Sequence, residues 1–128
     1  MKKIILIVVL IITFSFKLVI DASELKVPDG CEVLRCTLYL PTGNKTYDGT
    51  VPYVGICASN KEHLGQVAAL YTMDMQFIGN FECRDTGGNK DLVSGERIDI
   101  FCESRKGVEE WKNDYGDYVI VKWIKGVG

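Results

Sequence analysis

The sequence has very little histidine and no closely spaced cysteine pair. His63 is the only histidine among 128 residues, and the five cysteines form no Cys-x-x-Cys motif. Protein zinc sites are usually built from such pairs together with histidines. The sequence therefore argues against a metal centre, and we expect no cofactor. It argues equally against a Cys-His nucleophile pair, and we expect His63 to be a solvated residue in a polar stretch.

The chain also lacks an excess of positive charge. It contains 15 Lys and Arg residues against 17 Asp and Glu residues, for a formal net charge of -2. Proteins that bind nucleic acid need clustered Lys and Arg to displace counterions from phosphates. The sequence thus argues against a nucleic-acid partner. With 47% hydrophobic residues and no repeat, linker or low-complexity tract, it is typical of one globular domain.

No apolar run reaches the roughly 20 residues that a membrane span requires. The longest, residues 4–16, follows two lysines and is broken by Lys17. A short basic start before a short apolar run is typical of a secretory signal peptide. We expect residues 1–22 to be a signal peptide, cleaved after Ala22 or retained as an anchor, with membrane contact only in the second case. The protein would then be secreted or associated with the cell wall, beginning with a short segment at 23–31.

The number of cysteines is odd, at five. In an oxidising compartment up to two disulfides can form, and at least one thiol stays free in the monomer. The pairing cannot be deduced from the sequence. Strand alternation nevertheless predicts that Cys83 shares a face with Asp85 whereas Cys102 points away from Asp99. We therefore predict that Cys83 and Cys102 are not bridged.

Alternating β-forming residues dominate the rest of the chain. They predict six short strands, at residues 32–40, 51–57, 66–71, 77–83, 97–102 and 118–124. Residues 73–76 look like the bend of a hairpin. A helix is expected from a Ser104 cap to a Gly116 stop, and its stripe of Val108, Trp111 and Tyr115 favours core packing over a ligand platform. The fold class is mainly β, a small barrel with one short helix near the C-terminus.

Two segments carry more than strand propensity. Asp85-Thr86-Gly87-Gly88 leaves a strand into a tight turn, in which the Asp85 side chain would accept hydrogen bonds from turn amides. The second segment, residues 97–101, places Asp99 in an apolar strand, on the same face as Arg97. Asp99 is either a solvated outward residue or the floor of a cleft, and strand position alone favours the first.

These two segments resemble the 3D domain family, named for three aspartates. Further positions follow the family's order and approximate spacing: Thr37-Leu38-Tyr39, Gly55, Leu64-Gly65, Gly95 and Tyr118-Val119-Ile120-Val121. The resemblance covers roughly residues 32–125. It implies a six-stranded double-psi β-barrel over residues 32–128, related to the catalytic domain of MltA-type lytic transglycosylases, which cleave the glycan strands of peptidoglycan.

The resemblance also implies roles for single residues. Asp99 stands where those enzymes have their catalytic acid, and Asp85 would lie in the same cleft. The candidate substrate-binding residues are Thr86, Gly87, Gly88, Arg97, Asn60 and Tyr39. The chain departs from the family at its first aspartate, because Ala58-Ser59-Asn60 offers no acid there. Ser59 or Asn60 would then take a hydrogen-bonding role, or a catalytic partner is missing.

Three functions remain open from the sequence. The first is an exported enzyme that cleaves peptidoglycan with Asp99 as general acid and base. The second is a non-catalytic barrel that binds peptidoglycan or a related glycan, with aromatic side chains stacking on the sugars; the candidates for stacking are Tyr39, Tyr47, Tyr53 and Trp111. The third is an exported structural or interaction protein, in which the aspartates only hold turns. The sequence does not predict an oligomeric state.

Overall fold

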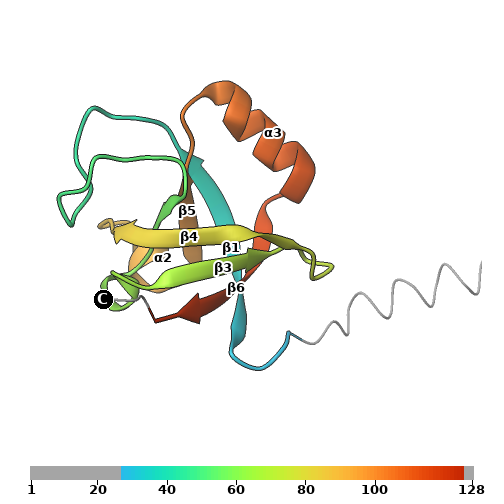
Figure 1. The fold of residues 1–128 in the computed structure, drawn as a ribbon. Helices are drawn as coiled ribbons and strands as arrows, with labels where there is room; N and C mark the ends of the chain where they lie inside the picture. Colours follow the sequence, from blue (N-terminus) through green and yellow to red (C-terminus); the bar gives the residue numbers. More distant parts are fainter. Residues whose placement is uncertain (1–26, 126–128) are drawn as a thin grey trace, which may run out of the picture.

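A closed barrel of six strands forms the body of the protein (Figure 1). The structure is a computed structural model that describes residues 27–125. The strands are β1 (Cys31–Tyr39), β2 (Ile56–Ala58), β3 (Val67–Tyr71), β4 (Phe77–Asp85), β5 (Arg97–Phe101) and β6 (Tyr118–Ile124). Three helical segments join them: η1 (Lys61–His63), α2 (Lys90–Val93) and α3 (Arg105–Tyr115). The expected signal peptide, 1–22, lies outside the described residues.

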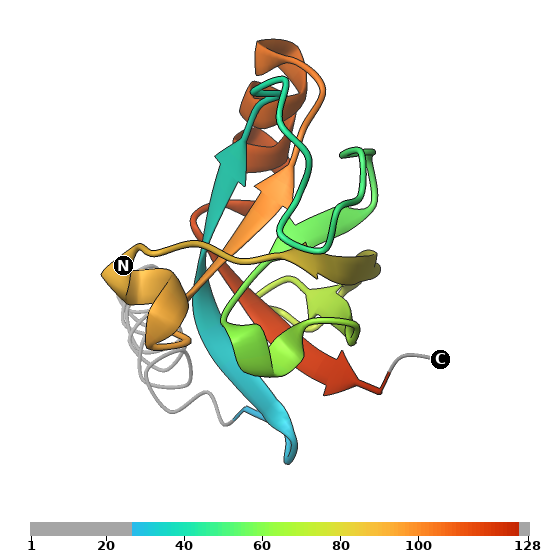
Figure 2. The same ribbon diagram turned by 90° about the vertical axis from the view of Figure 1, so that its left-hand side faces the viewer.

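Four of the five connections between consecutive strands pass an intervening strand, and we call two of them, residues 40–55 and residues 86–96, the crossover loops. Around the barrel the order is β1-β5-β2-β4-β3-β6, with β1 parallel to β5 and β2 parallel to β4. The loop from β1 to β2, residues 40–55, therefore passes β5. The loop from β4 to β5, residues 86–96, likewise passes β2, and Figure 2 shows it running across the face of the barrel. These two crossover loops bring distant segments of the chain together on one side.

The core lies inside the barrel and follows strand alternation. In β5, Ile98 and Ile100 are buried in the core cluster, whereas Arg97 and Asp99 are only partly buried on the other face. Burying one large aliphatic side chain contributes roughly 1.5–3 kcal/mol. Trp111 of α3 packs against this core, which confirms the core interpretation for this one residue of the stripe.

Most predicted elements are present, but two predictions were wrong. The second strand begins at Ile56 rather than at residue 51, because Val51 and Val54 are 68% and 60% exposed and Gly55 adopts a φ of 116° that interrupts an extended chain. The structure also has η1 and α2 besides the expected helix. That helix, α3, does begin after Ser104 and end at Gly116.

The hairpin bend at residues 73–76 is confirmed. It joins β3 to β4, which pair antiparallel, and the Thr72 amide donates to the Gln76 carbonyl at 2.8 Å. Met75 takes a φ of 68° in this bend, which is uncommon for a residue with a side chain.

No helix within residues 27–125 is long and apolar enough to cross a membrane.

All five cysteines are free thiols in this structure. Cys57 and Cys83 are register partners on β2 and β4, and both are completely buried. Burial raises the pKa of Cys36 to about 12, so this thiol stays protonated at neutral pH. The absence of a bridge between Cys83 and Cys102 in the protein stays a prediction.

Candidate functional site

The two conspicuous aspartates lie in one row across the barrel. Thr37 of β1 is the register partner of Asp99 on β5. Asp99 is in turn the partner of Ala58 on β2, and Ala58 is the partner of Asp85 at the end of β4. The aspartates therefore flank Ala58, which contributes only a methyl group between them. This is the segment in which the resemblance implies a third acid.

Asp99 faces away from the core but is not solvated. Its side chain is 16% exposed and that of its partner Arg97 is 14% exposed. Arg97 Nε lies 2.9 Å from Asp99 Oδ1, and Arg97 Nη2 donates to Oδ2 at 3.2 Å. The Nε–H is not aimed at that oxygen, so its contact is an ion pair rather than an aligned hydrogen bond. The Thr37 hydroxyl donates to Oδ1. The expected solvated aspartate was thus wrong, because its neighbours cover the outer face of β5.

Burial and charge act on Asp99 in opposite directions. Burial raises the pKa of this carboxyl above its ordinary value, Arg97 and then Arg35 lower the pKa, and Asp85 raises it. The net direction is upward. A carboxyl ordinarily ionises near pH 4, so the surroundings of Asp99 move its ionisation to higher pH.

Asp85 acts as an acceptor for two backbone amides. Its Oδ1 accepts from the Tyr47 amide at 2.9 Å and from the Thr86 amide at 2.9 Å. The turn role expected for Asp85 is therefore confirmed for Thr86. The contact with Tyr47 was not predicted, and it ties the first crossover loop to the start of the second.

Two buried hydroxyl groups lack partners near these carboxylates. The Tyr39 hydroxyl and the Ser59 hydroxyl have no hydrogen-bond partner in the described part of the chain. Burial, with the nearby charge of Asp85, raises the pKa of Tyr39, so it remains a neutral donor. An unpaired buried hydroxyl costs about 1–3 kcal/mol. An unpaired buried group calls for an explanation, and a functional role is one, so we take the neighbourhood of Asp85 and Asp99 as a candidate site.

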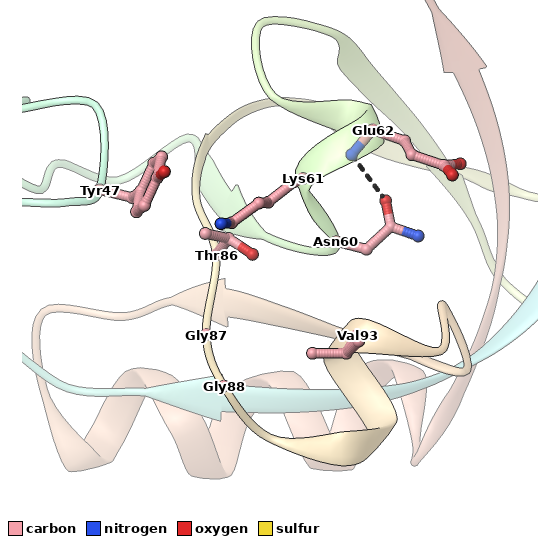
Figure 3. A pocket seen from close by; sticks show the side chains of 8 residues that line it. All are labelled: Tyr47, Asn60, Lys61, Glu62, Thr86, Gly87, Gly88 and Val93. Carbon is pink, nitrogen blue, oxygen red and sulfur yellow. Dashed lines mark hydrogen bonds between the residues drawn. The ribbon is translucent and has the colours of Figure 1, made fainter.

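A cavity of about 630 Å³ opens beside this row, between the two crossover loops (Figure 3). It is lined by Tyr47, Asn60, Lys61, Glu62, Thr86, Gly87, Gly88 and Val93. Four of the predicted substrate-binding residues line it: Asn60, Thr86, Gly87 and Gly88. The other candidates, Asp99, Asp85, Arg97 and Tyr39, do not. Neither Asp85 nor Asp99 lines this cavity, and Asp85 Oδ1 is bonded to backbone amides; that the two aspartates share one cleft stays a prediction.

Asn60 is mainly a helix cap. Its Oδ1 accepts from the Glu62 amide at 3.1 Å, and Figure 3 shows its side chain pointing away from the centre of the cavity. Its amide oxygen is therefore occupied, and Ser59 keeps the unpaired hydroxyl. Sequence reasoning missed Lys61, Glu62 and Val93 as lining residues. The polar stretch around Asn60 was the only signal for the first two, and none marked Val93.

A second cavity, of about 460 Å³, lies on the other side of η1 and shares Asn60 and Glu62 with the first. His63 lines it and stacks on Trp123, with ring centroids 3.8 Å apart. His63 also bonds Gln66 through Nδ1 at 2.8 Å. The prediction that His63 is a solvated residue was therefore wrong.

Within residues 27–125, no three His, Cys, Asp or Glu side chains gather closely enough to hold a metal ion.

Comparisons with known proteins add no relative. No family model matches the chain, and no curated protein matches it significantly. The similarity to the 3D domain family therefore stays an interpretation of the motif residues.

Proposed function

We propose that this protein is exported to the cell wall and cleaves peptidoglycan glycan strands as a lytic transglycosylase-like enzyme. The observation that carries the proposal is Asp99, a partly buried carboxyl whose pKa is raised by burial, with Asp85 and the unpaired Tyr39 hydroxyl close by. A pKa perturbed by burial and by neighbouring charge is common among catalytic groups. The adjoining cavities on both sides of η1 offer space for a chain of sugars.

We also assign the barrel to the double-psi type. Two features support this assignment. The loop 40–55 joins β1 to β2 across β5, and the loop 86–96 joins β4 to β5 across β2. In each case the two joined strands run antiparallel with one strand between them. Because these loops flank the larger cavity, this topology would place the substrate between them.

The proposed reaction needs one acid/base and no water. Asp99 would protonate the oxygen of the glycosidic bond as the bond to C1 breaks. The resulting Asp99 carboxylate would then take the proton of the sugar's own 6-hydroxyl as that oxygen bonds to C1. The product carries a 1,6-anhydro end, and Asp99 is returned to its acid form. General acid catalysis of this kind contributes typically about 10²- to 10⁴-fold.

A non-catalytic glycan-binding barrel is the second candidate. The ion pair between Arg97 and Asp99 favours it, because it holds the carboxylate form. Ala58 favours it as well, since it leaves the row with two acids. Tyr47 supplies an exposed aromatic ring in the larger cavity. The third candidate, a structural or interaction protein, has no such observation in its support.

Digestion of purified cell walls tests the proposal. The enzyme should release muropeptides with anhydro ends, identified by mass spectrometry. Sedimentation with walls, without any released product, would instead support the binding barrel. Neither release nor sedimentation would contradict both functions.

A further inference from the structure

The larger cavity is lined by a lysine, Lys61, that forms no ion pair with the described residues. Lys61 extends from η1 into the cavity toward Thr86, and Glu62, which also lines the cavity, directs its carboxylate away from Lys61 (Figure 3). The Nζ of Lys61 lies 5.3 Å from the centroid of the Tyr47 ring, a cation–π distance that holds the ammonium group at the cavity wall.

The rest of the cavity wall complements a sugar that carries an acid. The Tyr47 ring is 60% exposed and offers a flat surface for the apolar face of a sugar. Opposite it, Gly88 presents bare backbone with nothing within 4 Å of where a Cβ would be. The amides of Gly87 and Gly88 donate to no acceptor among the described residues, so they remain free for ligand oxygens. A volume of about 630 Å³ is within the range of small-ligand pockets.

Asp85 organises this wall without lining it. One carboxylate oxygen holds the amides of Tyr47 and Thr86, which belong to the two different loops that line the cavity. The aromatic ring and the glycine turn are thereby fixed relative to each other. A wall that is positioned in advance reduces the ordering cost of binding.

From these contacts we propose that the cavity recognises a carboxylate on an amino-sugar unit, with Lys61 as its counter-ion. This inference rests on the proposed function and names the part of the glycan that the cavity selects. The carboxylate can belong to the lactyl group of a muramic acid unit or to the peptide attached to that group. Both sources present the same charge to Lys61.

The test is NMR titration of the full chain with three sugars. N-acetylglucosamine is neutral, N-acetylmuramic acid adds a free lactyl carboxylate, and N-acetylmuramoyl-L-alanyl-D-isoglutamine carries its carboxylate on the peptide. We expect an acidic sugar to bind about tenfold more tightly than N-acetylglucosamine, as for one added charge-assisted contact. Tighter binding of N-acetylmuramic acid alone assigns the lactyl group, and tighter binding of the dipeptide form assigns the peptide.

Two lysine variants supply the controls. Lys61→Gln should abolish the preference, and Lys61→Arg should retain part of it. Lys106→Gln removes the same charge from α3 and should change nothing. Equal affinity for the three sugars, no measurable binding of the acidic sugars, or a preference that survives Lys61→Gln would overturn the inference. Release of anhydro-muropeptides is measured on the same proteins, so equal affinity of the native protein for the three sugars, with its release intact, contradicts this inference and leaves the proposed function standing.

Discussion

Asp99 and Arg97 form a partly buried ion pair, in which burial and the charge of Arg97 shift the pKa of Asp99 in opposite directions. Burial makes ionisation of Asp99 costly, and the guanidinium group of Arg97 offsets part of that cost. Removing one partner of such a pair leaves the other charge poorly solvated, which destabilises the fold. Any neutral substitution of Asp99 therefore also leaves the charge of Arg97 without its partner, and this lowers the stability of the fold.

Arg97→Gln should raise the pKa of Asp99 further, because Arg97 lowers it by charge and by a hydrogen bond. A general acid acts in its protonated form, which is complete below its pKa and is lost as the pH rises through it. The alkaline limb of the activity profile should therefore move to higher pH. Carbon NMR titration of the Asp99 carboxyl measures the same shift without substrate.

Arg35→Gln is the graded control for that change. Arg35 also lowers the pKa of Asp99, but less than Arg97 does. It should move the limb in the same direction by a smaller amount. An unchanged limb in Arg97→Gln, or a limb at lower pH, would contradict the assignment of Asp99 as the acid.

A second pair of variants separates the charge of Asp85 from its acceptor role. Asp85→Asn keeps the Oδ1 that holds the amides of Tyr47 and Thr86, whereas Asp85→Ala leaves both amides without this partner. Asp85→Ala should lower the free energy of unfolding by about 1–3 kcal/mol, the usual cost of an unmade hydrogen bond. Asp85→Asn should cost less. Urea unfolding measures both, and an equal loss in the two variants would show that the charge matters instead.

At the scale of elements, the first crossover loop is held by a local network around Asp48. Its Oδ1 accepts from the hydroxyls of Thr46 and Thr50, each at 2.6 Å. Arg84 of β4 adds an ion pair at 3.5 Å. This network fixes the segment that carries Tyr47 into the cavity, although the segment has no regular secondary structure.

The Asp48 network should weaken in acid. Burial pushes the pKa of Asp48 upward, but the hydrogen bonds from Thr46 and Thr50 outweigh it, and the net pKa is lowered. A lowered pKa contributes stability above the unfolded-state value, and that stability is lost as the pH falls through the folded value. Asp48→Ala should therefore speed amide hydrogen exchange in residues 46–50 at neutral pH. It should also remove the loss of protection that protonation of Asp48 causes in the native protein as the pH falls. Asp48→Asn, which keeps Oδ1, should exchange more slowly than Asp48→Ala; identical exchange in the native protein and both variants would contradict this.

The sequence predicted the elements that depend on interactions between residues close together in the chain. Alternation in residues 97–101 and the caps of α3 at Ser104 and Gly116 needed no distant contact. The second strand was overextended because alternation cannot tell a buried strand from an exposed loop. The short helices η1 and α2 have too few residues to show a periodicity.

At the scale of the whole molecule, the candidate site depends on pairing between distant segments. The motif residues Asp85 and Asp99 were found from the sequence, but the row that places Ala58 between them follows from the register of β2 with β4 and β5. The stacking of His63 on Trp123 likewise joins segments 60 residues apart in a chain of 128. Contacts between distant segments leave no pattern in the local sequence. This explains why the sequence did not predict Lys61 as a lining residue or the burial of Asp99 by its neighbours.

Release of anhydro-muropeptides by the native protein and by Asp99→Asn tests the central claim most directly. Asparagine keeps the size of the side chain but cannot supply a carboxylic proton, so release should fall about 10²- to 10⁴-fold. Because Asp99→Asn also leaves Arg97 without its counter-ion, thermal melts accompany the assay, and the double variant Arg97→Gln/Asp99→Asn should regain stability without regaining activity. Native activity that persists in a folded Asp99→Asn protein would contradict the account.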